Sequence, residues 1–182
     1  MAFAAKFKDE LLECFDEDGS RAHPRYRSEV CVDGTRRWHG TADTWVFNRD
    51  GLFICSQRSP AVQNSPNKWQ TYSGGHVKAG VPFVETAAKE LYEELGIKVR
   101  PQDLHLIEKG RSEPMMHVFE HYVILFEGGL KDLRFLDGEV IDAKWYEFEK
   151  YKKTKEQNPE KWCCGMTEEN YSEIMEWIKS QN

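Results

Sequence analysis

The sequence has no long apolar run, no excess of positive charge and no two cysteines in CxxC spacing. No stretch approaches the roughly 20 apolar residues that are needed to span a bilayer. The formal net charge of −6 argues against a broad, non-specific nucleic-acid surface. We therefore expect neither a membrane span nor an extended nucleic acid as a partner.

The cysteine count is small and odd, and no secretory signal is visible, because charged residues interrupt the first ten positions. Reduced thiols in a reducing compartment are therefore the better interpretation, and we expect a cytoplasmic protein. The adjacent pair Cys163-Cys164 could form a vicinal disulfide or half of a metal site. Two packed thiols are the simpler expectation.

The composition indicates a globular chain with a substantial core. It has 182 residues, of which 40% are hydrophobic and 13% aromatic, without an internal repeat or a long linker. This predicts a single domain over 1–182, with a core at about 11–150 and a C-terminal helical extension at 151–182. Phe3, Phe7 and Leu11 are four residues apart, which favours docking of this segment on the domain over a membrane anchor.

Hydrophobic periodicity and turn residues predict a mixture of strands and helices. A hairpin turn is expected at 48–51, a loop at 59–68, an extended segment at 69–73, and irregular polar chain at 20–37. Since the elements follow no strict βαβ rhythm, we expect an α/β fold with a mixed sheet flanked by helices. Strands are predicted at 44–47, 52–57, 104–109, 118–126 and 140–146, with a strand or helix end at 11–15. Helices are predicted at 83–95, 147–157 and 167–179, with Thr167 capping the last.

The helix at 83–95 carries an unusual cluster of acidic side chains. Glu90, Glu93 and Glu94 fall within an arc of roughly 100°, on the side away from its apolar face. Like charges at this spacing repel one another, and carboxylates are ligands that hard divalent cations such as Mg²⁺ prefer. Gly74-Gly75 lets the backbone approach the same place closely and offer a carbonyl. A solvated acidic face is the alternative explanation of the glutamates alone.

This stretch resembles the Nudix box, G-x5-E-x7-R-E-U-x-E-E-x-G-U, where U is a bulky aliphatic residue. Two positions depart from the pattern: Val81 replaces the first glutamate and Lys89 replaces the arginine. Lys89 keeps a charge without the planar guanidinium, and it can pair with Glu93 one turn on. The matching positions are Gly75, Glu90, Leu91, Glu93, Glu94, Gly96 and Ile97.

The resemblance covers roughly residues 11–150. Within the family, this stretch is similar to the branch related to isopentenyl diphosphate isomerase. It implies a Nudix-type α/β/α sandwich with a mixed central β-sheet. It also implies Mg²⁺ or Mn²⁺ bound by Glu90 and Glu94, with Glu93 nearby and the carbonyl of Gly74. The implied activity is hydrolysis of the diphosphate bond of a small, nucleotide-linked substrate. Dimers are common in the family, so a homodimer is an expected assembly.

A carboxylate must take the proton from the attacking water in such a reaction. In many relatives that base lies on a later loop, and Glu120 and Glu139 are the candidates here, with Glu93 or Glu94 as alternatives. For substrate binding, the guanidinium of Arg58 suits phosphate oxygens. Lys68, Trp69 and His76 are further candidates around the pocket, although core packing is the simpler expectation for Trp69.

Two other activities are compatible with the same fold. The departures at Val81 and Lys89 leave room for a catalytically weak nucleotide-binding or regulatory protein. The second alternative is isopentenyl diphosphate isomerase itself, because His39 and His76 stand where that enzyme has metal-binding histidines. However, another of its ligand histidines falls near Val32, and Gly74 stands where it needs a cysteine that transfers a proton.

Overall fold

The computed structural model describes residues 10–31 and 37–181. Phe3 and Phe7 lie outside the described residues, and so does Val32. Within the described part of the chain, no helix combines the length and the apolar character that crossing a membrane requires.

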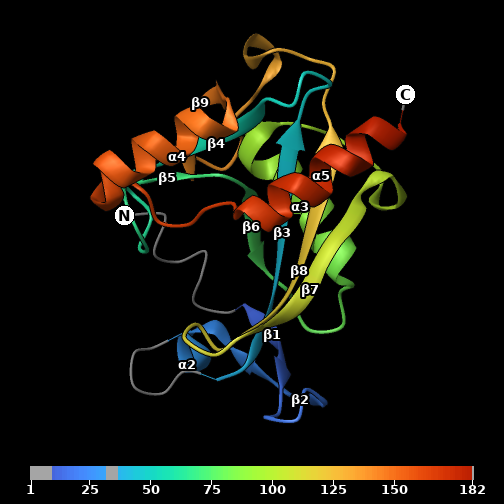
Figure 1. Ribbon diagram of the computed structural model, residues 1–182. Coiled ribbons are helices and arrows are strands. Elements are labelled where there is room, and N and C mark those ends of the chain that lie inside the picture. Colours follow the sequence, from blue (N-terminus) through green and yellow to red (C-terminus); the bar gives the residue numbers. More distant parts are fainter. Residues whose placement is uncertain (1–9, 32–36, 182) are drawn as a thin grey trace.

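A mixed sheet with strand β3 (His39–Phe47) at its centre organises the molecule (Figure 1). β3 runs parallel to β8 (His117–Leu125) and antiparallel to β1 (Leu11–Phe15), β4 (Phe53–Arg58) and β6 (Ser73–His76). The other pairs are antiparallel: β1 with β2 (Arg21–Tyr26), β4 with β5 (Trp69–Gln70) and β9 (Val140–Tyr146), and β7 (His105–Ser112) with β8.

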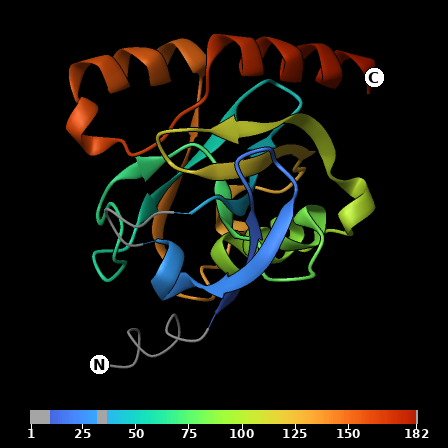
Figure 2. The same ribbon diagram turned by 90° about the horizontal axis from the view of Figure 1, so that it is seen from below.

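Helices cover both faces of this sheet, and Figure 2 shows α4 (Phe148–Gln157) and α5 (Glu168–Ser180) along one side of it. Helix α3 (Phe83–Leu95) packs against β6, β3 and β8 on the opposite face. Alternation along β3 serves both layers: Ala42 and Val46 pack with Leu91 of α3, whereas Trp45 and Phe47 pack in the cluster that contains Ile174 of α5. The predicted α/β/α sandwich is therefore confirmed.

The sequence signals at turns and helix ends are confirmed where they rest on local chemistry. Helix α3 ends at Gly96, which adopts the left-handed conformation with φ 73°. The β3–β4 turn is closed by Asn48, whose side-chain oxygen accepts from the amides of Asp50 and Leu52. Thr167 caps α5 by accepting from the amide of Asn170 at 3.1 Å.

The prediction of irregular chain at 20–37 is wrong in its first part. Strand β2 spans Arg21–Tyr26, and the short helix α2 follows at Arg27–Val30. β2 pairs with β1 among the described residues and most of its side chains are exposed, so it lacks the apolar residues that mark a buried strand. Pro24 is tolerated in a strand at the edge of a sheet. The division into a core at 11–150 and an extension at 151–182 stays a prediction.

Candidate active site

A cleft of about 420 Å³ opens where β6 passes between β3 and the last turns of α3. Its walls combine carboxylates from α3, backbone from β6 and basic side chains from several loops. The residues that line the cleft include Arg27, Asp43, Arg58, Gln70, Gly74, Gly75, His76, Lys78, Glu90, Glu93, Glu139, Cys163 and Cys164.

The two glycines of β6 are required by close packing. A Cβ on Gly74 would lie 2.7 Å from the carbonyl oxygen of Ala42, and a Cβ on Gly75 would lie 2.7 Å from the carboxyl carbon of Glu90. Any side chain at either position would have to displace strand β3 or the Glu90 carboxyl group. The backbone of β6 therefore lies directly against the carboxylate cluster, as the sequence predicts.

The three box glutamates differ in exposure. Glu94 is buried with 1% of its surface exposed, whereas the side chains of Glu90 and Glu93 are 17% and 33% exposed. Burial and the neighbouring charge of Glu90 hold the pKa of the Glu94 carboxyl well above its usual range. Burial likewise raises the pKa of Glu90. A buried and a half-buried carboxylate thus interact through their charges and offer only oxygen ligands, which fits a hard divalent cation.

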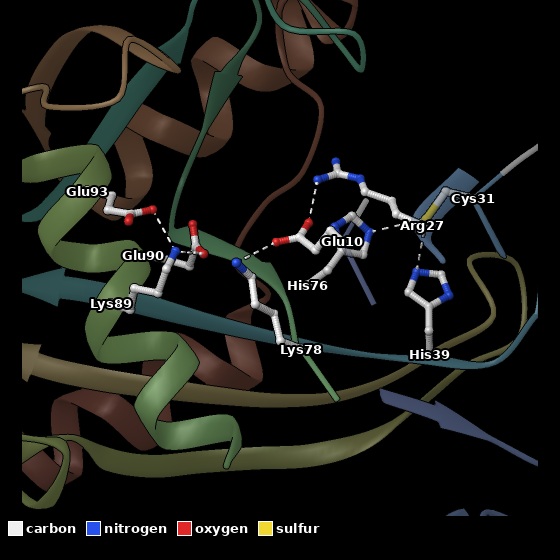
Figure 3. A network of polar contacts seen from close by, with 9 residues as sticks. All are labelled: Glu10, Arg27, Cys31, His39, His76, Lys78, Lys89, Glu90 and Glu93. Carbon is white, nitrogen blue, oxygen red and sulfur yellow. Dashed lines mark hydrogen bonds and ion pairs between the residues drawn. The ribbon is translucent and has the colours of Figure 1, made fainter. Parts of the chain in front are cut away.

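Lys89 is the positive charge nearest to this pair along α3. Its ammonium lies 2.9 Å from Glu90 Oε1 and 2.6 Å from Glu93 Oε2, so the predicted pairing with Glu93 is present (Figure 3). Although burial acts in the opposite direction, the hydrogen bond to Glu93 and the charge of Glu90 raise the pKa of the Lys89 amine. Lys89 therefore holds Glu93 and one oxygen of Glu90 in place.

Val81 leaves the loop before α3 without a carboxylate of its own, but strand β1 supplies one. Glu13, 5% exposed, accepts a hydrogen bond from the amide of Gly80 at 2.7 Å. Its other oxygen lies 3.5 Å from Arg21 Nε. The loop that leads into α3 is thus braced from a different strand.

Arg58 and Glu139 both face the carboxylate cluster. The guanidinium of Arg58 donates to Asn64 O at 3.0 Å and to Gln70 Oε1 at 2.9 Å, and Gln70 Nε2 lies 3.5 Å from Glu94 Oε2. Glu139 raises the pKa of both Glu90 and Glu94 by its charge, after the larger effects of burial and nearer charges. The structure therefore brings Arg58 and Glu139 together with the box glutamates.

Other candidates lie elsewhere. Glu120 accepts a hydrogen bond from the Tyr122 hydroxyl, and it does not line the cleft. The ring centroids of Trp69 and Trp162 are 6.3 Å apart, and the Lys144 ammonium lies 4.6 Å from the centroid of the Trp69 ring. Trp69 is partly buried and packs against the core, which was the simpler expectation for it. Lys68 precedes Trp69 and also lies outside the lining, whereas His76 lines the cleft.

Sequence reasoning missed the acidic group on the central strand. Asp43 is buried, and its Oδ2 lies 3.3 Å from His121 Nε2, while burial raises the pKa of its carboxyl group. Because side chains alternate along a strand, the sequence could have predicted that Asp43 lies on the same face of β3 as Trp45. It could not have predicted that this position of the strand reaches the cleft. The thiols of Cys163 and Cys164 lie 3.6 Å apart without a disulfide, as expected of two packed thiols.

Comparison with known proteins decides the family. The NUDIX domain model matches residues 37–164, which is more than half of the chain. The chain belongs to the Nudix family. An uncharacterized Nudix hydrolase of Clostridium acetobutylicum is 36% identical over 100 residues, which are 53% of this chain and 47% of that protein. The chain thus spans about half the length of this relative.

Two further comparisons extend over more of this Nudix chain. An isopentenyl-diphosphate Delta-isomerase of Serratia proteamaculans is 24% identical over 157 residues, which are 84% of this chain and 85% of that protein. The crystal structure of DR0079 from Deinococcus radiodurans has a TM-score of 0.70 at 16% identity, covering 94% of this chain and 98% of that one. At this identity the latter likeness shows the Nudix fold alone.

Proposed function

We propose that this Nudix chain hydrolyses the diphosphate bond of a small, nucleotide-linked substrate with the help of Mg²⁺ or Mn²⁺. The observation that carries the proposal is that Glu90, Glu139 and Arg58 line one cleft and that their charges all act on the buried carboxyl group of Glu94. Relatives are named Nudix hydrolases. The Nudix domain of Shewanella oneidensis NrtR, with a TM-score of 0.51 at 13% identity over 78% of this chain and 86% of that one, was crystallised with ADP ribose.

The residues present fit a divalent cation. Glu90 and Glu94 would hold it, with Glu93 beside them and the carbonyl of Gly74 as a further oxygen donor. Such an ion neutralises phosphate charge and lowers the pKa of bound water. A cation there would also relieve the mutual repulsion of buried carboxylates that Lys89 neutralises only from one side.

The side chains of the cleft have separate tasks in this proposal. Arg58 orients a phosphate through its remaining N–H groups, because Asn64 and Gln70 fix its plane. Glu139 takes the proton from the attacking water, since Glu90 and Glu94 are committed to the cation and Glu120 is outside the cleft. The oxygen of water then bonds to phosphorus, the P–O bond of the anhydride breaks, and two phosphomonoesters leave.

The structure gives the isomerase alternative little support at the position where that activity needs a cysteine. The space in front of Gly74 is filled by Ala42 and Asp43, so β6 has no room for a thiol there. A catalytically weak nucleotide-binding protein differs from the hydrolase only in turnover. The two are separated by the experiment below.

The test incubates the protein with a panel of nucleoside diphosphate derivatives, including ADP-ribose, in the presence of Mg²⁺ or Mn²⁺. A phosphatase converts the monoester products to phosphate, which is then measured. We expect release by the wild type and its loss in Glu94→Gln. Equal, negligible release from both, together with saturable nucleotide binding by the wild type, would make the chain a binding protein. The isomerase alternative is tested separately and without the phosphatase, by following the conversion of isopentenyl diphosphate to its double-bond isomer, because isomerisation releases no phosphate.

We further propose that the chain acts as a homodimer in the cytoplasm. None of the five cysteines, all of which lie in the described residues, forms a disulfide, and this supports a reducing compartment. Light scattering of the purified protein tests the dimer.

A further inference from the structure

Two adjacent thiols form part of the cleft wall, in the segment that joins α4 to α5. Cys163 and Cys164 both line the cleft, and both are half-buried. Their Sγ atoms lie 3.6 Å apart, in hydrogen-bonding contact. The hydrolysis proposed above gives neither thiol a task.

The backbone holds this pair in place from both sides. Trp162 is buried in the core and forms a parallel bridge with Trp69 of β5. The Cys163 amide donates to the carbonyl oxygen of Trp69 at 3.1 Å. On the other side, a Cβ on Gly165 would meet the Tyr151 hydroxyl, so a side chain there would have to displace that group. A well-anchored segment therefore presents the thiols to the cleft.

The two sulfur atoms have different electrostatic surroundings. Arg58 and Lys68 act on Cys163 with positive charge, whereas Asp43 acts on the neighbouring thiol with negative charge. The hydrogen bond from Cys164 lowers the pKa of the Cys163 thiol, and the charge of Arg58 adds to this against the effect of burial. The same hydrogen bond, together with burial, raises the pKa of Cys164. Cys163 is thus the thiol that ionises, and Cys164 donates to its thiolate.

Two neighbouring oxygen atoms do not reverse this assignment. Cys163 Sγ lies 3.5 Å from the Trp69 carbonyl oxygen, but a thiol is a weak donor, so this contact does little to keep the proton on Cys163. Tyr72 lowers the pKa of Cys164 through a hydrogen bond, and this effect is smaller than those of Cys163 and of burial. The thiolate therefore belongs to Cys163.

This arrangement suits oxidation of the pair. The thiolate is the reactive form of cysteine toward peroxides, and the resulting sulfenic acid condenses with a thiol beside it. The sulfur atoms are already in contact, so no distant element has to move for them to bond. Adjacent Cα atoms are about 3.8 Å apart, whereas disulfides prefer about 4.4–6.8 Å, so the bridge would be strained and easily reduced again.

We propose that Cys163 is a site of covalent modification in the cleft wall, which hydrogen peroxide oxidises and Cys164 then closes to a disulfide. First, the Cys163 thiolate attacks one peroxide oxygen; the S–O bond forms, the O–O bond breaks and hydroxide leaves. Then the Cys164 sulfur attacks the sulfenic sulfur, the S–S bond forms, and the sulfenic hydroxyl leaves as water with the Cys164 proton. Two thiols are oxidised and one peroxide is reduced to two waters. The proposal does not depend on the hydrolase activity.

The test treats the reduced full chain with hydrogen peroxide and maps every cysteine by mass spectrometry. We expect the peptide that contains Cys163 and Cys164 to lose two hydrogen atoms and to regain them with dithiothreitol. In a separate experiment, iodoacetamide at neutral pH should alkylate Cys163 about 10-fold faster in the folded chain than in the urea-unfolded chain, where only a few per cent of an ordinary thiol is ionised.

Serine variants separate the roles of the two thiols. Cys164→Ser should stop at the sulfenic acid, which dimedone traps on Cys163. Cys163→Ser should leave Cys164 reduced at the same dose of peroxide. Cys31 is the control, because it is also half-buried but its Sγ lies 3.7 Å from His39 Nε2 and 3.6 Å from His76 Nε2; it should take no part in the disulfide.

Three results would overturn the proposal. They are a wild type that keeps both thiols under peroxide, a Cys163 that is alkylated no faster in the folded chain, and a Cys163→Ser variant in which Cys164 is oxidised as fast as in the wild type. If a serine variant loses its native circular dichroism, the two wild-type measurements decide by themselves.

Discussion

Replacement of Glu94 by glutamine should make the metal-free protein more stable and at the same time remove its response to Mg²⁺. The Glu94 side chain is 1% exposed and is crowded by the negative charges of Glu90 and Glu139. Glutamine has the same shape, keeps an oxygen for the amide of Gln70 and carries no charge. The substitution therefore removes an unfavourable buried charge without opening a cavity.

The sign of the pH effect follows from the raised pKa of the Glu94 carboxyl. The folded state holds a proton on Glu94 at pH values where the unfolded chain has released it, so the free energy of unfolding falls as the pH rises between the unfolded and the folded pKa. Above the folded pKa the full penalty is present. The metal-free wild type should thus gain stability on acidification through this range, and Glu94→Gln should lose this part of the pH dependence.

We expect a gain of about 1–2 kcal/mol for Glu94→Gln at neutral pH, as when a functional site is relieved of strain. For a chain of this size, 1 kcal/mol corresponds to about 2–4 °C in Tm. Thermal melting with chelator and with millimolar Mg²⁺ measures both effects. The wild type should be stabilised by Mg²⁺ through mass action, and Glu94→Gln should not.

The matched control is Glu85→Gln, which changes an exposed glutamate in the first turn of the same helix. It should alter Tm little and leave the response to Mg²⁺ intact. A lower Tm for Glu94→Gln in chelator would refute the argument from buried charge, and equal stabilisation of both variants by Mg²⁺ would show that Glu94 is not a metal ligand.

Three other substitutions test separate parts of the cleft. Glu139→Gln should lower kcat about 10²–10⁴-fold while the stabilisation by Mg²⁺ persists, and steady-state kinetics beside melting curves would check this. Gly75→Ala should push the Glu90 carboxyl from its place and cost about 1–3 kcal/mol of stability, which urea denaturation measures. Lys89→Ala should cost less than about 1 kcal/mol, because its ion pairs are partly exposed, and calorimetry should find Mg²⁺ still bound; loss of binding would give Lys89 a larger role.

Local chemistry explains which elements could be predicted from the sequence. Helix α3 is bounded by Pro82 and by Gly96 in the left-handed conformation, so its limits were readable residue by residue. By contrast, β3 begins at His39, five residues before the predicted start at Thr44. Its first half is buried although it is polar, because β1, β6 and β8 surround it. Burial by partners distant in sequence leaves no local signal.

The same division applies to the site. The spacing of Glu90, Glu93 and Glu94 predicts a shared helix face. Glu139 and Arg58 were candidates from the family resemblance, and the fold brings both into the cleft that Glu90 and Glu93 line. The sequence comparison assigned an isomerase ligand position near Val32 and did not consider the neighbouring Cys31. Its meeting with His39 and His76 depends on where α2 ends relative to β6.

The register of β6 on β3 decides which residues of β6 face the box carboxylates. Gly75 lies opposite Ala42 and His76 opposite Thr41, and consecutive residues of a strand point to opposite faces. Gly75 therefore faces the Glu90 carboxyl, while the ring of His76 turns away toward Cys31. A slip of one residue would drive the imidazole into the carboxylates and leave Cys31 facing glycine. The short strand thus keeps the His76 ring apart from the box carboxylates, and its glycines keep that register in place because a side chain at Gly74 or Gly75 would meet β3 or the Glu90 carboxyl group.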